Sequence, residues 1–310
     1  MPSISEIDRV RLAEAFRLAD RLQEQVWPQW PTAPFAALLV TPEYEFLMRH
    51  PQPSEDFQDA GFDRLLQSRV HYRKRQFDTH LLATFPAVNG LSTVVIGQAE
   101  NTFVKTSTPW VVTLLHEHFH QLQDSQPNIY EESAALGLAH GDTTAMWMLN
   151  YPFPYANAEV NAAFSTAAKA LADALAAVTS PDFAEKAAAF RTAHRLFQQT
   201  VSEEEVRYLE FQLWKEGVAR YTEYRIALLA SLVYEPRKEF VALADYTPYV
   251  LTAASLNKGF VADLPDISLA RSQRAAFYAY GAAQALLLDT INPHWQQRYL
   301  HEKFRLDVHF

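Results

Sequence analysis

The spacing of apolar and polar positions along the chain predicts a small sheet followed by a large helical part. An amphipathic pattern over residues 4–25 predicts a first helix. β-Branched and apolar residues bounded by turn-forming residues predict three short strands, at 35–40, 77–85 and 92–98. After residue 108 the pattern is almost wholly helical and includes an alanine-rich stretch at 158–190. A small mixed sheet followed by helices predicts an α+β protein.

The same pattern suggests how the chain is divided. We expect an N-terminal α/β part at 1–107 and a mainly helical part at 108–310, with a helical insertion at about 128–201. No apolar run approaches the roughly 18 residues of a membrane span. The N-terminus has early acidic residues and lacks the apolar core of a signal peptide. The compartment is therefore the cytoplasm if this N-terminus is native, and an exported location if a leader was removed.

The helix predicted at the start of the second part, in STPWVVTLLHEHFHQLQDSQP, is the most informative. Thr108 is its expected N-cap, Pro109 its first residue, and Pro127 lies just past its end. Four apolar residues at helical spacing form the expected buried stripe: Val111, Leu115, Phe119 and Leu122.

Beside that stripe, His116, Glu117 and His120 match the pattern HExxH. The two imidazoles are one turn apart and point the same way, so both can reach one zinc ion. Glu117 would then face the water that the metal activates and act as general base in its attack on a carbonyl. His118 points to the other side and is expected to pack. Asp124 either orients a ligand imidazole or is a plain surface acid.

The chain has no cysteine, so a third zinc ligand must be His, Asp or Glu. The best candidate is Glu216 in WKEGVARYTEY, within a long helix that opens with a capping box of Ser202 and Glu205. Gly217 follows it in mid-helix, where glycine costs about 1 kcal/mol. Close approach of the zinc-bearing helix is one explanation for that glycine. The competing ligands are Glu223, Glu131 and Glu132, and Glu223 is also a candidate for orienting a ligand.

Four motifs together resemble the gluzincin aminopeptidases, the family typified by aminopeptidase N. WKEGVARYTEY resembles that family's WLNEGFAxYxEY, GQAEN at 97–101 resembles GxMEN, and YAYGAAQALLLD at 278–289 resembles YxKGxxxLxML. With HExxH, all four occur in the family's order. The resemblance implies a thermolysin-like catalytic unit that binds one Zn²⁺ per chain and hydrolyses peptide bonds.

The resemblance also implies a catalytic role for each matching residue. The zinc ligands would be His116, His120 and Glu216, and Glu117 would be the general base. Tyr278 would donate its hydroxyl to the oxyanion of the tetrahedral intermediate. A zinc peptidase needs such a donor where negative charge develops, and a tyrosine hydroxyl suits that task.

Substrate binding is implied for Gly97, Glu100 and Asn101. They would belong to an edge strand that pairs with extended peptide backbone. Glu100 would hold the free α-amino group through charge-assisted hydrogen bonds. The predicted activity is therefore that of a zinc metallopeptidase, aminopeptidase-like in its preference.

Several departures keep alternatives open. Only 96 residues precede GQAEN, whereas the family carries a large β domain there. Glu216 follows His120 by 96 residues, although the family's third ligand comes soon after HExxH. Ala99 and Tyr280 replace a Met and a Lys of the family, and Tyr280 or Tyr221 could substitute for Tyr278. A zinc endopeptidase, another small-substrate hydrolase on the same fold, and a non-catalytic zinc-stabilised helical protein remain as alternatives.

Composition narrows the choice of partners. The net charge of −9 disfavours nucleic acid and anionic membranes, because both attract basic surfaces. Apolar residues make up 49% and charged residues 20%, which is typical of a soluble globular protein. The expected partner is a peptide or protein substrate, and the pattern does not indicate an oligomeric state.

Overall fold

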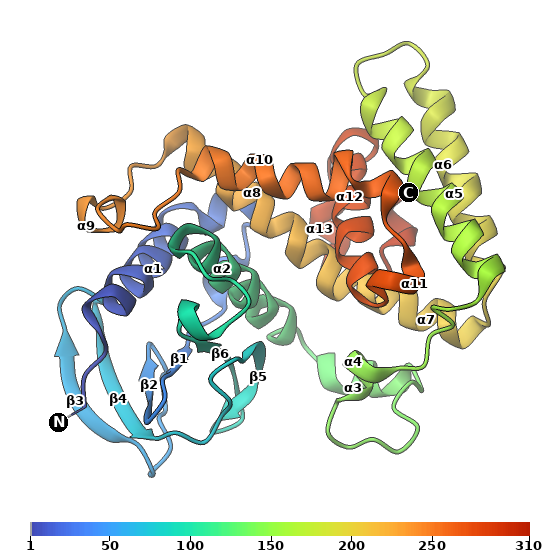
Figure 1. The fold of residues 1–310 in the computed structure, drawn as a ribbon. Helices are drawn as coiled ribbons and strands as arrows, with labels where there is room; N and C mark the ends of the chain where they lie inside the picture. The colour runs from blue at the N-terminus through green and yellow to red at the C-terminus, as the bar shows by residue number, and fades with distance from the viewer. Residues whose placement is uncertain (1) are drawn as a thin grey trace. The chain divides into compact units, whose positions relative to one another are not determined.

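The computed structural model of the protein describes residues 2–310, and these form a mixed sheet and a larger helical part (Figure 1). The α+β prediction is therefore confirmed. The chain forms two compact units: unit 1 runs to Gln126 and resumes over Thr222–Ala254, and unit 2 consists of Pro127–Tyr221 and Ser255–Phe310. This differs from the expected division at residue 107, because the HExxH helix packs with the first helix and the sheet.

Unit 1 contains a six-stranded sheet in the order β3-β4-β2-β1-β6-β5. Its strands are β1 (Ala37–Val40), β2 (Tyr44–Met48), β3 (Gln58–Asp63), β4 (Ser68–Lys74), β5 (Leu82–Val88) and β6 (Leu91–Gly97). β1 and β6 are parallel, with Leu38 opposite Val95, and the other neighbours are antiparallel. Three of the strands, β1, β5 and β6, overlap the predicted ones.

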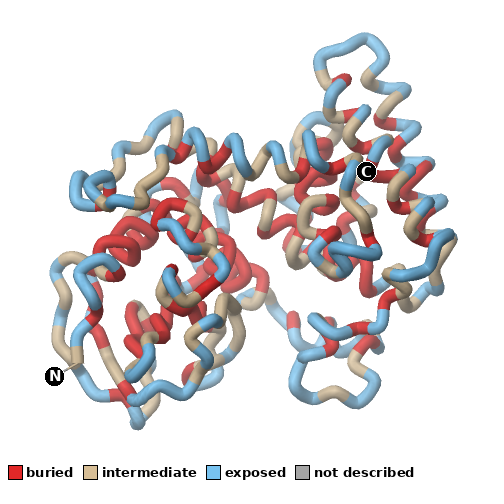
Figure 2. The backbone as a smooth tube through the Cα atoms, in the orientation of Figure 1, coloured by how far each residue is buried: buried red, intermediate tan, exposed pale blue. Residues whose placement is uncertain are grey.

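The helices α1 (Glu6–Val26) and α2 (Ser107–Asp124) pack together, and α2 also contacts β5 and β6. Buried apolar residues form a core cluster in this unit: Leu38, Val40, Leu47, Phe57, Val88 and Val95. Unit 1 also contains two short 3₁₀ helices, η1 (Trp30–Thr32) and η2 (Ala99–Asn101), and the helix α9 (Lys238–Val241). Figure 2 shows that most of α1 and α2 is buried.

Unit 2 is helical. Its longest elements are the adjacent helices α5 (Ala158–Ala176) and α6 (Phe183–Gln198), together with α12 (Ala275–Ile291), which packs on α5. Shorter elements are α3 (Ile129–Ala135), α4 (Trp147–Asn150), η5 (Leu264–Asp266), α11 (Leu269–Ser272), α13 (Trp295–Tyr299) and η6 (Asp307–His309). The helix α10 (Tyr249–Asn257) begins in unit 1 and ends in unit 2, where the π-helical turn η4 (Lys258–Ala262) follows it.

The long helix predicted from Ser202 consists of three consecutive segments. They are α7 (Glu203–Gln212), the π-helical segment η3 (Leu213–Gly217) and α8 (Val218–Val233). The predicted capping box is confirmed: Ser202 accepts from the backbone of Glu205, whose side chain returns the bond. π-Helical segments leave irregular backbone groups and occur frequently at functional sites. Here the hydroxyl of Tyr299 donates to the carbonyl of Trp214 over 2.6 Å.

Gly217 is explained by a close approach, though not by that of the HExxH helix. A Cβ at Gly217 would lie 2.6 Å from the Cα of Gly281 on α12, and a Cβ at Gly281 would lie 2.7 Å from the Cα of Gly217. Both neighbours are backbone atoms, which cannot yield cheaply. The two glycines therefore let the backbones of η3 and α12 come into contact. This contact sets the position of Glu216 along α12.

Replacing Gly281 by Ala is expected to lower the free energy of unfolding by about 3 kcal/mol, near the upper end for overpacked cores. Gly259 offers a matched control, because a Cβ there meets nothing within 4 Å. Gly259→Ala should be neutral or add up to about 1 kcal/mol through helix propensity. Chemical denaturation of both variants and the wild type checks this, and equal stability for Gly281→Ala would contradict the packing argument.

Within residues 2–310, no helix combines the length and the apolar character needed to cross a membrane.

Candidate metal centre

The helix α2 places its polar residues within the core of unit 1. It begins with Thr106 as N-cap, two residues before the predicted Thr108, whose Oγ1 instead accepts from the backbone N–H of Thr247. Pro109 still falls in the first turn, where a missing N–H costs little. The helix ends at Asp124, before Pro127 as predicted. His116, Glu117 and His120 are at most 7% exposed, so their polar atoms require partners.

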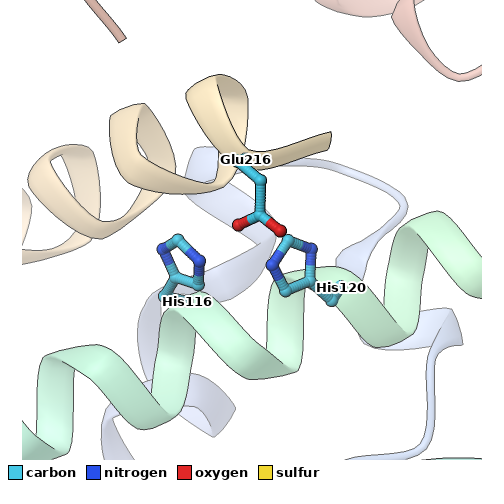
Figure 3. Close-up of side chains that lie close together, drawn as sticks. All are labelled: His116, His120 and Glu216. Carbon is cyan, nitrogen blue, oxygen red and sulfur yellow. The ribbon is translucent and has the colours of Figure 1, made fainter. Parts of the chain in front are cut away.

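The structure brings together the three predicted ligands. Ligand atoms of His116, His120 and Glu216 all lie within 4.8 Å of one another. In Figure 3 the two imidazoles stand side by side on α2, and the carboxylate of Glu216 points toward them. Tetrahedral ligands at about 2.1 Å from zinc are roughly 3.4 Å apart. Two imidazoles and one carboxylate are also a donor set that zinc takes in catalytic sites.

Each histidine has a side-chain oxygen near its Nδ1, and the one beside His120 is close enough for a hydrogen bond. Glu223 Oε2 lies 3.4 Å from Nδ1 of His116, and Gln123 Oε1 lies 2.5 Å from Nδ1 of His120. Because the amide oxygen of Gln123 accepts, the proton of His120 is on Nδ1. Nε2 then keeps its lone pair and can bind a metal ion. Such partners fix the tautomer and the orientation of metal-binding histidines. Glu223 thus lies beside His116, as the sequence suggested, but at an ion-pair distance and not as a hydrogen-bond acceptor of Nδ1.

Asp124, the other residue considered for that orienting task, accepts a hydrogen bond from Ser92 Oγ over 2.8 Å. Gln123, one residue earlier, is the side chain that contacts His120. The sequence held a signal for it, since Gln123 lies three residues after His120 on the same helix face. Asp124 thus connects α2 to β6.

Glu117 is held by the sheet. The hydroxyl of Thr84 on β5 lies 2.8 Å from Oε2 of Glu117 and 2.8 Å from its backbone oxygen. A hydroxyl has one proton to donate, so it is shared between these acceptors. This contact holds the carboxylate of Glu117, which is not a member of the ligand group. Such a position suits a general base more than a metal ligand.

His118 is packed, as predicted. It is fully buried, stacks on Phe35 at 3.9 Å between ring centroids, and contacts the amide oxygens of Gln121 and Gln23. Burial lowers the pKa of His118 to about 3, so the ring is neutral. It contributes to the core and not to the candidate metal centre.

Tyr278 lies close to Glu216 in unit 2. Burial, followed by the negative charge of Glu216, raises the pKa of Tyr278 well above its usual value, so the phenol keeps its proton. Nη1 of Arg274 donates to the Tyr278 hydroxyl over 2.6 Å and lies 3.8 Å from Oε1 of Glu216. Tyr278 accepts from Arg274, and its own hydrogen is directed to the carboxylate of Glu216.

The alternatives to Tyr278 and Glu216 have other contacts. Tyr221 donates to Asp289 over 2.8 Å, and the hydroxyl of Tyr280 lies 2.9 Å from Nδ1 of His194. Both rings are fully buried. Glu131 and Glu132 are exposed on α3, and Glu132 makes an ion pair with Lys303. Among residues 2–310, the grouped metal-ligating side chains do not include these acids.

The prediction that GQAEN belongs to an edge strand along which substrate lies is wrong. β6 ends at Gly97 and lies between β1 and β5, so it is an interior strand, and Ala99–Asn101 form a 3₁₀ turn. Sheet order depends on long-range pairing, which the motif GQAEN does not encode. Gly97 itself is required by packing, since a Cβ would lie 1.9 Å from the carbonyl oxygen of Thr79.

Glu100 and Asn101 also have structural contacts. The carboxylate of Glu100 is 56% exposed and accepts from Arg11 Nη1 over 2.8 Å, while the carbonyl of Asn101 contacts His80. Arg11 also lies 3.4 Å from Asp8 and 3.2 Å from Asp245, so three carboxylates share one buried guanidinium. The strand at this edge of the sheet is β5, which carries Thr84 beside Glu117.

Comparison of the chain with protein-family models, with curated proteins and with solved structures gave no match.

Proposed function

We propose that the protein is a zinc-dependent metallopeptidase of gluzincin type, with His116, His120 and Glu216 as ligands. The observation that carries this proposal is the grouping of these three side chains, from motifs 96 residues apart, within 4.8 Å. The neighbouring Glu117 and Tyr278 supply the two further groups that amide hydrolysis needs. The motif order of the gluzincin aminopeptidases supports the same function.

The roles of the chain's own groups follow from their environments. When bound, zinc would supply a Lewis acid that polarises the carbonyl and makes water a stronger nucleophile. Glu117 would accept the proton of the attacking water on Oε2, from which the Thr84 hydroxyl can swing to the backbone oxygen of Glu117. It would then pass this proton to the leaving amine. Tyr278 would donate its hydrogen to the oxyanion.

The substrate backbone would lie along β5 instead of β6. β5 is an edge strand, and one side of an edge strand offers unpaired N–H and C=O groups to an extended peptide. Pro86 lies within β5, as is common for edge strands. The carboxylate of Glu100 pairs with Arg11, and the function proposed here requires no preference for free amino termini.

The test is the metal content of the purified protein, combined with cleavage of a peptide library. We expect one zinc per chain in the wild type, with turnover lost on chelation and restored by added zinc. Glu216→Ala removes one of three ligands and should abolish stoichiometric zinc and turnover. Elemental analysis and mass spectrometry of the digest measure both.

The control is Glu203→Ala, an exposed acid at the start of the same helical stretch, which should retain zinc and activity. Full zinc retention in Glu216→Ala would move the third ligand elsewhere and contradict the proposal. A large chelator-induced drop in melting temperature without any turnover would favour a non-catalytic, zinc-stabilised protein.

A further inference from the structure

Two arginine side chains flank Tyr278 within unit 2. The guanidinium carbon of Arg274 lies 5.3 Å from the centroid of the Tyr278 ring, and that of Arg220 lies 5.9 Å from it. The chain as a whole has a net charge of −9, so two arginines close to one tyrosine differ from its average charge. They bring two guanidinium groups to one tyrosine ring, close to the carboxylate of Glu216.

Helix geometry brings these groups together. Arg220 follows Glu216 by four residues along η3 and α8, and Arg274 precedes Tyr278 by four residues at the start of α12. Side chains four apart share a helix face. The contact of η3 with α12 at Gly217 and Gly281 sets the two faces against each other.

Arg274 has donors to spare for an anion. Its side chain is 26% exposed, and Nη1 makes its one hydrogen bond to a described residue, to Tyr278. Its anionic neighbour is Glu216, at 3.8 Å, which is long for a charge-assisted bond. A metal ion held by Glu216 would share its charge and weaken this ion pair further. The Nε and Nη2 groups of Arg274 are available to an acceptor close to Glu216.

We propose that Arg274, assisted by Arg220, is a carboxylate-binding subsite, and that the substrates are peptides with a carboxylate close to the scissile bond. A guanidinium presents parallel N–H donors that match a carboxylate in bidentate geometry. The carboxylate belongs either to the C-terminus of the substrate or to an Asp or Glu side chain. The proposal rests on the proposed peptidase function, and it replaces recognition of an amino group by Glu100 with recognition of an acid.

The experiment uses two peptide pairs that differ in a single negative charge. The first is acetyl-Ala-Phe-Leu-Ala with a free C-terminus, against its C-terminal amide. The second is acetyl-Ala-Phe-Glu-Leu-amide, against the same peptide with Gln in place of Glu. Wild type, Arg274→Gln and the control Arg271→Gln, an exposed arginine on α11, are compared with all four.

We expect the wild type to prefer the acidic member of at least one pair by about 10- to 100-fold in kcat/KM, as for a hydrogen bond to a charged group. Arg274→Gln should remove this preference mainly through KM, while Arg271→Gln keeps it and Arg274→Lys restores part of it. The pair that shows the preference identifies which carboxylate is bound. Equal rates within both pairs, or an Arg274→Gln loss of the same size for acidic and neutral peptides, would overturn the subsite.

A binding measurement separates this proposal from the peptidase function. Fluorescein-labelled versions of the four peptides are titrated with zinc-loaded Glu117→Gln protein, and anisotropy reports the affinity without turnover. Tighter binding of an acidic peptide, lost on adding Arg274→Gln, supports the subsite even if no variant cleaves. Indifference to the charge contradicts it even if the wild type is an active peptidase.

Discussion

Glu117→Gln is expected to lower kcat/KM for a cleaved peptide by about 100- to 10,000-fold while leaving the zinc content unchanged. Glutamine keeps the size of the side chain and can still contact Thr84, so packing is preserved. Glutamine cannot take a proton from water. A loss of kcat/KM at unchanged zinc content therefore reports on the general base and not on metal binding. Steady-state kinetics with elemental analysis of the same sample measures both quantities.

Glu131→Gln is the matched control, because this exposed acid on α3 lies outside the ligand group. It should have wild-type kinetics. Unchanged turnover in folded, zinc-loaded Glu117→Gln protein would remove Glu117 from the reaction and would leave HExxH as a metal-binding motif alone. A simultaneous loss of zinc would instead show that the carboxylate supports the ligands.

The local part of the site could be predicted because one helix encodes it. The spacing of His116 and His120 fixes their common direction wherever α2 is placed, and the spacing of Ser202 and Glu205 likewise fixes a helix start. Glu216 required more, since it comes from another helix, and the EGxAxY motif supplied the clue. The structure groups these three side chains as the motifs suggested.

What depends on pairing between distant segments could not be predicted. β3 (QDAGFD) and β4 (SRVHYRK) have few apolar residues in alternation, so they gave no strand signal and the sheet order stayed open. With three strands missing, the motif GQAEN was assigned to an edge, although β6 is interior. Close approach of the HExxH helix was one explanation for Gly217, but its close neighbour is Gly281 on α12, 64 residues later in the chain.

Arg274 could not be predicted either, because its contacts also depend on the packing of distant segments. Arg274 is one turn before Tyr278, yet nothing in the local sequence distinguishes it from a surface arginine. Its contacts with Tyr278 and Glu216 appear only when η3 and α12 are packed. The charge environment of the candidate site is thus a property of the fold, whereas the ligand types are a property of the motifs.

Tyr278→Phe is expected to lower kcat by about 100- to 1000-fold with little change in KM, the signature of a donor that acts in the transition state. The phenol keeps its proton because burial and Glu216 raise its pKa well above its usual value. Arg274 donates to its oxygen, and the Tyr278 hydrogen, which is directed to Glu216 when no substrate is bound, would turn to the oxyanion. Phenylalanine preserves the ring between the two arginines but has no hydrogen to give.

Tyr280→Phe, two residues along α12, provides the contrast. The Tyr280 hydroxyl contacts the buried His194, so its removal should lower the melting temperature and leave kcat near the wild-type value. If kcat falls in Tyr280→Phe and not in Tyr278→Phe, the oxyanion donor is not Tyr278. If KM rises in Tyr278→Phe at constant kcat, the hydroxyl binds ground-state substrate, and its place beside Arg274 makes it part of the carboxylate subsite instead.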